Sequence, residues 1–290
     1  MKTIRNTIMM MSAILAFSCA PEQNDDMFDV PQDGYTFFET DFQSVDFEGE
    51  ADQFWKKGVD IGVFGSIEGV NERYTLKKAF DSKASGEFYG PKVSGDIVAY
   101  YPYSPDFRLL GGKPHYELAP VQEYDGTGSL YEQFCKYSTV TYAFADGGKL
   151  SFGHASGVLS VEVRVTGAGA VKSLTLASAE PLAGMGGVEG DLSVSLSASG
   201  SKTLCLDCGE GLDPKDGQQY RDFPFVMPAG SYSGVTLTVE FASGKPLKVR
   251  LDDVEIVRLT TSGQEIKTVT VSNGLGGFEV EDGLTFEPLS

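Results

Sequence analysis

Short runs of alternating apolar and polar residues, broken at close intervals by glycine-rich turns, restrict the fold of this chain more than any other feature. Residues 158–165 (VLSVEVRV) and 235–241 (VTLTVEF) place valine or leucine on one face and glutamate, arginine or threonine on the other. Such a period of two residues is typical of a β-strand, because successive side chains point to opposite faces. Similar runs occupy residues 97–103, 173–176, 192–196, 247–251 and 266–271. The pattern predicts half-buried antiparallel strands.

Helical patterns are scarce. Residues 130–137 (LYEQFCKY) could form two helical turns, and no other segment combines a period of 3.6 residues with capping residues. At 290 residues the chain is longer than one hydrophobic core usually serves. We therefore predict an all-β protein made of two β-sandwich domains, 34–150 and 151–290.

The N-terminus has the form of an export signal. Lys2 and Arg5 precede a short apolar run, residues 8–17, which ends at Ser18 and Cys19. About ten apolar residues suit a signal peptide, whereas a permanent membrane helix needs roughly 20. We expect residues 1–18 to be a lipoprotein signal peptide, Cys19 to be lipidated, and residues 19–33 to be a polar tether. The alternative is a plain secretory signal with an incidental cysteine.

The charge balance limits the classes of partner. The formal net charge is −18, and loss of Lys2 and Arg5 with the signal peptide makes the remaining chain more negative. A chain of this charge repels phosphate backbones and anionic lipid headgroups. We expect no nucleic-acid partner and no membrane contact through the protein body.

Three cysteines remain after Cys19, so they cannot all pair within one molecule. Cys205 and Cys208 have C-x-x-C spacing, but no second C-x-x-C accompanies them. A zinc site would need Cys135 and a histidine, His115 or His154, to converge on this pair. A local disulfide and ordinary thiols in or beside a strand are the other two possibilities.

Motifs that carry catalysis are missing from the sequence. His115 and His154 stand in no metal-binding spacing, and no nucleophile elbow or phosphate-binding loop occurs. His154 is expected to be a hydrogen-bonded histidine at a strand junction, and residues 184–190 (GMGGVEG) a flexible hairpin loop. Asp252 and Asp253 would point to opposite faces of a strand, which spoils them as a shared carboxylate site. We predict neither an enzyme, nor a cofactor, nor a metal.

Aromatic side chains are the remaining candidates for ligand contact. Sugar rings stack on exposed tryptophan and tyrosine, and the candidates here are Trp55, Tyr100, Tyr101 and Tyr103. Alternation along residues 97–103 would bury about half of these tyrosines. Core packing therefore explains most of them, and a stand-alone glycan-binding protein is the second hypothesis for function.

Four segments, in the same order along the chain, resemble the Bacteroidetes fimbrillin-like lipoproteins, which supply subunits of type V pili. The first segment is similar to their W-x-x-G-D-x-I-G-V-F pattern, and the others are similar to an N-x-x-Y element with an A-Y-Y-P-Y strand, an F-x-H strand and a proline-turn-strand unit. The matching residues are Trp55, Gly58, Asp60–Phe64, Asn71, Tyr74, Ala99, Tyr100–Tyr103, Phe152, His154, Leu159, Val161, Val163 and residues 225–245.

The resemblance implies two transthyretin-like (Greek-key) sandwich domains in tandem and a lipid-anchored place on the outer membrane or in a fimbrium. It also implies adhesion, with other fimbrial subunits as partners and a host or bacterial surface protein or glycan as receptor. Polymerising members lose an N-terminal strand to an arginine-specific protease, but the first arginine after Cys19 is Arg73. This favours an anchor, tip or accessory subunit over a stalk subunit.

Strand exchange needs an extended segment with alternating side chains near a terminus. A sandwich that lacks one strand exposes unpaired backbone groups and an apolar slot, which a donated strand fills. Residues 35–42 and 278–289 have this character, and either could instead be an ordinary edge strand. The side chains predicted to take part are Tyr35, Phe37, Phe278, Val280, Leu284 and Phe286.

Overall fold

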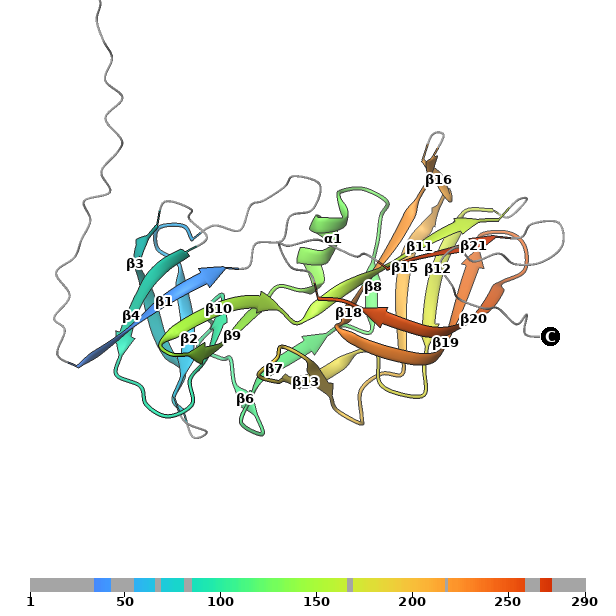
Figure 1. The fold of residues 1–290 in the computed structure, drawn as a ribbon. Coiled ribbons are helices and arrows are strands. Elements are labelled where there is room, and N and C mark those ends of the chain that lie inside the picture. The colour runs from blue at the N-terminus through green and yellow to red at the C-terminus, as the bar shows by residue number, and fades with distance from the viewer. Residues whose placement is uncertain are drawn as a thin grey trace, which may run out of the picture. The chain divides into compact units, whose positions relative to one another are not determined.

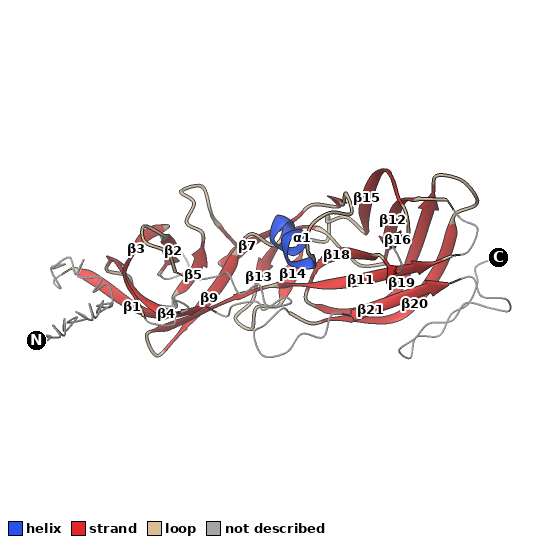
Figure 2. Cartoon of the chain, turned by 90° about the horizontal axis from the view of Figure 1, so that it is seen from above, coloured by secondary structure: helices blue, strands red, loops and turns tan. Residues whose placement is uncertain are grey.

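The structure is a computed structural model, and its regular secondary structure is almost entirely β-strand (Figures 1 and 2). It describes residues 34–42, 55–65, 69–80, 85–165, 169–216, 219–258 and 267–272. All of these lie in one compact unit, Pro31–Ser290. The predicted signal peptide, Cys19, the predicted tether and the C-terminal candidates Phe278, Val280, Leu284 and Phe286 lie outside the described residues.

The N-terminal strands form a closed barrel in the order β1-β10-β9-β5-β2-β3-β4. These strands are β1 (Tyr35–Phe42), β2 (Asp60–Phe64), β3 (Glu72–Ala79), β4 (Ser85–Pro91), β5 (Val98–Tyr101), β9 (Thr141–Asp146) and β10 (Lys149–His154). β1 closes the barrel by pairing antiparallel with β4 and parallel with β10 (Figure 1). Residues 34–150 were predicted to form a two-sheet sandwich, and this closure is the difference, because both potential sheet edges are bonded to β1.

An aromatic-rich core fills the barrel. Its largest buried members are Phe38, Tyr74, Phe88 and Phe152, together with Trp55 from the segment before β2. Gly90 of β4 lets the Tyr74 ring lie close to the backbone of this strand, because a Cβ on Gly90 would sit 2.5 Å from the ring.

The C-terminal strands form two further sheets around a second, larger hydrophobic cluster. One sheet has the order β18-β11-β21 and the other β20-β19-β12-β15-β8. The strands are β8 (Val121–Glu123), β11 (Ser156–Arg164), β12 (Val171–Ala177), β15 (Thr203–Leu212), β18 (Asp222–Pro228), β19 (Gly230–Phe241), β20 (Leu247–Ile256) and β21 (Lys267–Ser272). Alternate residues of β12 and β19 are buried, as the two-residue period predicted.

A four-stranded sheet, β14-β13-β7-β6, joins chain from both halves of the sequence. Its strands are β6 (Leu109–Leu110), β7 (Lys113–Leu118), β13 (Gly184–Val188) and β14 (Val194–Leu196), and a separate hairpin pairs β16 (Lys215–Asp216) with β17 (Gln219–Tyr220). β8 likewise precedes residue 150 but pairs with β15. Strands from before residue 150 thus share sheets with strands from after it, and a domain division at residue 150 stays a prediction.

The only helix among the described residues is α1 (Leu130–Tyr137), where the sequence allowed two turns (Figure 2). Its start is fixed by a capping box, in which Ser129 Oγ accepts from the Glu132 amide and the Glu132 carboxylate accepts from the Ser129 amide. The two hydrogen bonds satisfy backbone amides that have no partner within the helix at its N-terminus. Glu132 near the start and Lys136 near the end suit the helix dipole. The helix is too short to cross a membrane.

Candidate functional site

β1 lies between two strands, and it pairs with β4 over most of its length and with β10 over its second half. It runs antiparallel to β4 from Tyr35↔Pro91 to Asp41↔Ser85, and parallel to β10 from Glu39↔Lys149 to Phe42↔Phe152. An ion pair between Lys149 and Asp41 joins β1 to β10. β1 is therefore the closing strand of the barrel in the described part of the chain, and it is not the edge strand that was the alternative expectation.

The side chains of β1 divide between the barrel core and the outer surface. Phe38 and Thr40 are buried, and Thr40 Oγ1 donates to the Gly86 carbonyl across 3.1 Å. Tyr35 is 41% exposed, and Phe37 is partly buried on the outside beside Tyr89, with ring centroids 6.4 Å apart. Tyr35 and Phe37 were the predicted strand-exchange side chains, but the residues of β1 that are buried in the barrel are Phe38 and Thr40. Whether the strand exchanges stays a prediction.

Trp55 is a core residue and offers no ring face to a sugar. It is 3% exposed, and its ring meets Phe88, Tyr101 and Phe152 edge-on at centroid distances of 4.8, 5.3 and 5.5 Å. Edge-to-face contacts of this kind are a favoured packing of aromatic rings. The stacking role expected for Trp55 is therefore wrong for this fold.

Tyr100 is also buried and has a structural role. Its hydroxyl donates to the Ser104 carbonyl at 2.6 Å, and its ring stacks on Phe107 with centroids 3.7 Å apart. Burial raises the pKa of this hydroxyl. The ligand-stacking expectation fails for Tyr100 because its faces are occupied, while Tyr101 and Tyr103 are partly exposed and keep that role as a prediction.

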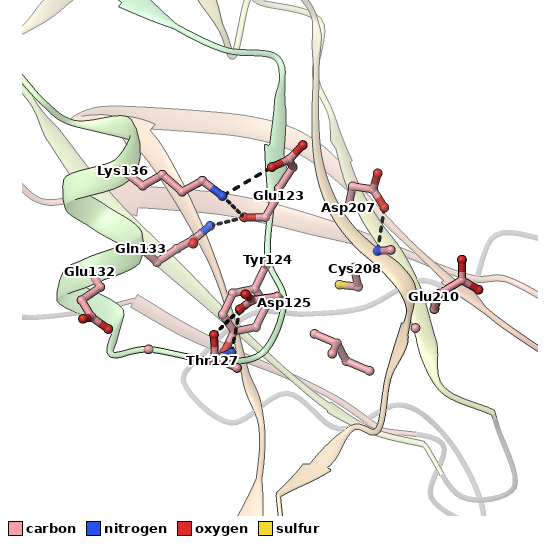
Figure 3. A pocket seen from close by; sticks show the side chains of 14 residues that line it. Glu123, Tyr124, Asp125, Thr127, Glu132, Gln133, Lys136, Asp207, Cys208 and Glu210 are labelled. Carbon is pink, nitrogen blue, oxygen red and sulfur yellow. Dashed lines mark hydrogen bonds and ion pairs between the residues drawn. The ribbon is translucent and has the colours of Figure 1, made fainter.

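An acidic groove of about 630 Å³ lies between the β8–α1 segment and β15 (Figure 3). Five carboxylates line it, with one amine, Lys136, that reaches Glu123 at 3.6 Å. The carboxylates belong to Glu123, Asp125, Glu132, Asp207 and Glu210. This excess of negative charge favours cationic groups over anions. Among the described residues, no three His, Cys, Asp or Glu side chains come together in an arrangement that could hold a metal ion.

The loop that forms one wall of the groove is held by its own hydrogen bonds. Asp125 Oδ1 accepts from both the amide and the hydroxyl of Thr127, at 2.8 and 2.6 Å, and these bonds lower the pKa of the Asp125 carboxyl (Figure 3). On the opposite wall, Asp207 accepts from the Gly209 amide at 2.9 Å. These carboxylates therefore serve local turns.

The cysteines are free thiols in this structure. Cys205 and Cys208 lie on β15, Cys135 lies on α1, and none of the three is in a disulfide. Burial raises the pKa of the Cys208 thiol to about 12, so it carries no thiolate near neutral pH. For Cys205 and Cys208 the structure thus shows thiols within a strand, whereas Cys135 is a thiol on a helix.

His154 is a buried histidine where β10 meets β11. Its Nδ1 lies 3.1 Å from Ser138 Oγ, and its ring packs edge-on against Phe134 of α1 at 4.8 Å. Among the described residues Nε2 has no hydrogen-bond partner. Burial lowers the pKa of His154 to about 4, so the imidazole is neutral at physiological pH. The expected role at a strand junction is confirmed.

A second pocket, of about 350 Å³, has an aromatic lining that sequence analysis did not single out. Phe107, His115, Tyr137 and Tyr142 contribute rings, and Glu117 lies exposed among the lining residues. The Tyr142 hydroxyl donates to the His115 carbonyl at 3.0 Å. These residues come from segments that no local pattern connects, so only the fold brings them together.

Comparison with known proteins gives a match at the level of fold. No family model matches the sequence, and no curated protein matches it significantly. A crystal structure of a proposed cell adhesion protein from Bacteroides ovatus superposes with a TM-score of 0.50 at 13% identity, covering 87% of this chain and 96% of the other. The chain shares this fold.

Other matches carry similar descriptions at lower structural similarity. A fimbrial protein from Bacteroides vulgatus has a TM-score of 0.43 at 12% identity, covering 87% of this chain and 99% of the other. The tip fimbrial protein Mfa3 from Porphyromonas gingivalis has a TM-score of 0.43 at 9% identity, covering 88% and 99%. The structural neighbours are thus fimbrial and cell-adhesion proteins of Bacteroidetes, and they are not enzymes.

Proposed function

We propose that this protein is a cell-surface, fimbrillin-like subunit or adhesin that assembles with partner subunits by exchange of the strand at the β1 position. The observation that carries the proposal is the double pairing of β1, which bonds β4 on one flank and β10 on the other. Departure of β1 would leave a slot with unpaired backbone on both walls, and an extended peptide is the occupant that satisfies such walls.

The interior of that slot is apolar, which supports the same proposal. Phe38 lies in the barrel core beside Tyr74, with ring centroids 5.6 Å apart. Loss of this ring would expose apolar surface that a donated side chain could cover again. An incoming strand should therefore carry a large apolar residue at the position of Phe38 and a small or polar one at the position of Thr40.

Proteolytic release of β1 at an arginine has no support in the described fold. Arg73 lies within β3 and pairs with Asp60 at 2.5 Å, so a cut there would break the barrel itself. Lys56 and Lys57 are exposed just before β2. We therefore propose an anchor, tip or accessory role in preference to a stalk role.

We further propose that the mature chain is held at the outer membrane by lipid on Cys19. The support is the sequence alone: Lys2 and Arg5, a short apolar run, and a cysteine after a small residue. A Cys19→Ala variant is expected to move from the membrane fraction to the medium. Retention of the variant in the membrane fraction would contradict lipid anchoring.

Strand exchange is tested by cutting the folded chain between Phe42 and Trp55 at an inserted protease site. A peptide copying residues 278–289 is then added to the cut and uncut proteins, with a scrambled peptide as control. We expect the peptide to displace the β1 fragment from the cut protein only. A β1 fragment that stays bound, with no peptide incorporated even close to the unfolding midpoint, would rule out exchange at this slot.

Assembly on cells is tested by immunoblotting unheated and heated surface extracts in SDS. Strand-exchanged polymers should give a ladder that collapses on heating. A single band in both samples would point to a lipid-anchored monomer and would reject polymerisation.

A glycan-binding role is the second candidate, and the aromatic pocket favours it. The pocket offers the rings of Phe107, His115 and Tyr137 beside polar groups, a lining that suits the apolar and hydroxylated faces of a sugar. A His115→Ala variant that loses binding on a glycan array but keeps its unfolding midpoint would support this role. Equal array signals for the variant and the parent would reject it.

A further inference from the structure

Two edges of the C-terminal sheets are closed to additional strands. On β18, Val226 turns its backbone away from β11, and the Gln122 side chain takes both groups: Val226 N donates to Oε1 at 2.9 Å and Nε2 donates to Val226 O at 2.7 Å. Pro224 and Pro228 share this orientation and have no amide hydrogen. A partner strand would therefore find no free donor at these three positions.

The free part of β15 is closed in another way. β8 pairs with β15 only from Cys205 to Asp207. Beyond that point Gly209 has φ of +59°, and its amide bonds to the Asp207 side chain. The extended conformation needed for a ladder ends there.

β20 differs from both, because it is long and regularly paired on one side only. It bonds β19 from Gly230↔Ile256 to Val239↔Leu247, and no strand of the described residues pairs with its other flank. A flank that the described strands leave unpaired over this length is a site where a further strand can add.

The charges along β20 are ordered by sign. Its exposed cations, Lys248 and Arg250, come first, and its exposed anions, Asp253 and Glu255, come last. A second β20 running antiparallel, centred between residues 251 and 252, places Lys248 opposite Glu255 and Arg250 opposite Asp253. Each pair occurs twice by symmetry, so the strand is complementary to itself.

The burial pattern supports the same register. Val249 and Leu251 are buried in the first half of β20, whereas Val254 and Ile256 are buried in the second half, so the buried face switches near the centre. Gly234 of β19, with φ of +60°, lies at the matching place on the neighbouring strand. This register pairs odd-numbered residues with even-numbered ones, so in a strand without the switch it would place buried side chains opposite exposed ones. Because the buried face switches near the centre, Val249 instead lies opposite Val254, which is also buried, and the exposed charged residues lie opposite one another.

We propose that two copies of this chain associate through β20, antiparallel and in the register that pairs Lys248 with Glu255 and Arg250 with Asp253. The contact joins the two five-stranded sheets into one sheet across a twofold axis. It is independent of β1 and of strand exchange.

The test uses the mature chain and measures mass by sedimentation at several concentrations. A Lys248→Glu/Arg250→Glu variant sets carboxylates opposite Glu255 and Asp253, and a complementary Asp253→Arg/Glu255→Lys variant sets cations opposite Lys248 and Arg250. Each is expected to weaken the dimer at least about tenfold, because like charges face each other across the strands. A Lys92→Glu/Lys202→Glu variant makes the same charge change at exposed lysines outside β19 and β20 and should leave the dimer intact.

Mixing separates the proposed pairing from misfolding. An equimolar mixture of the two β20 variants places cations opposite anions again, so it should form a heterodimer although each variant alone is a monomer. The proposal would be overturned if the parent chain stayed monomeric at about 100 times the concentration used for the variants. A dimer that survives both charge reversals, or an equimolar mixture that stays monomeric, would overturn it as well.

Discussion

Gly62 on β2 occupies a position where only a hydrogen fits. It is directly opposite Tyr100 of β5, and a Cβ at residue 62 would lie 1.9 Å from Tyr100 Cε1. The ring in turn is fixed by Phe107 and Ser104, so it cannot move aside cheaply.

We expect Gly62→Ala to lower the free energy of unfolding by about 3 kcal/mol or more, since overpacking in a core forces a shift of the ring or the strand. Urea denaturation measures the effect. Gly190→Ala is the control, because no atom lies within 4 Å of its added Cβ, and it should change stability by less than about 0.5 kcal/mol. Equal midpoints for the two variants would show that the barrel accommodates the methyl group.

His154 makes stability depend on pH through burial. Its pKa in the folded chain is about 4, against 6.5 for an ordinary histidine, so between these values the unfolded chain binds more protons than the folded one. Stability is therefore complete above about pH 6.5 and falls as the pH decreases toward 4.

Lowering the pH from about 7.5 to about 5 should cost about 2 kcal/mol through this group alone. A His154→Phe variant removes the titration, and its loss of stability over the same interval should be smaller by that amount in urea denaturation. Parallel pH profiles for parent and variant would contradict the assigned burial of the imidazole.

Single residues were partly predictable from the sequence. The strand-junction role of His154 followed from its local context, and the pattern of alternation anticipated that most aromatic candidates pack in the core. The side of the barrel that Phe38 and Phe37 occupy could not be derived, because residues 35–42 (YTFFETDF) carry aromatic residues at both even and odd positions. Only pairing with β4 and β10 decides which of them is buried.

One side chain, that of Gln122, satisfies the backbone hydrogen bonds of Val226 at the edge of β18. Gln122 is fully buried, and its amide replaces a neighbouring strand for both backbone groups of Val226. Because the bonds form between residues 104 positions apart, they fix β8 to β18.

We expect Gln122→Ala to reduce the free energy of unfolding by about 3 kcal/mol, because the Val226 amide and carbonyl would both be buried without partners. Gln122→Glu can accept from the Val226 amide but cannot donate while ionised, so its loss should shrink as the pH decreases and the carboxyl protonates. Thermal melts near pH 7 and pH 5 measure both effects. A Gln122→Ala variant as stable as the parent would show that water replaces the amide.

Secondary structure with a strong local pattern was predicted well. α1 lies where residues 130–137 allowed a helix, and β11, β12, β19, β20 and β21 overlap runs that were chosen for their alternation. Residues 184–190 were expected to be a flexible loop, yet β13 forms there because Gly186 packs tightly against the backbone of β14, with a hypothetical Cβ only 2.6 Å from Ser195 O. Glycine content alone misled the prediction, since it marks close approach of two strands as well as flexibility.

At the scale of the whole molecule, local patterns predicted an all-β protein but not how its sheets close. The pairing of residues 39–42 with 149–152 spans most of the barrel sequence, and no periodicity reports it. The acidic groove and the aromatic pocket are equally products of distant segments. The acidic composition argues against a nucleic-acid partner through charge repulsion, and that expectation stays a prediction.

The two hydrophobic clusters should respond differently when β1 is lost. After the cut between Phe42 and Trp55 and removal of the β1 fragment, amides of β4 and β10 are expected to exchange with deuterium much faster, because each loses its bonded neighbour. Amides of β12 and β19, which belong to the other cluster, should keep their protection. Hydrogen exchange followed by mass spectrometry measures both. Uniform loss of protection throughout the chain would show that the clusters unfold as one unit.

The double pairing of β1 also has a mechanical consequence. Its ladder bonds to β4 are perpendicular to the strand, so a pull along the strand axis strains the rows on both flanks together. A strand at a free edge, pulled sideways, gives way one bond at a time. The strand at this position should therefore resist detachment most strongly when the tension acts along its axis. Flow past a cell that the protein tethers would produce tension of this kind.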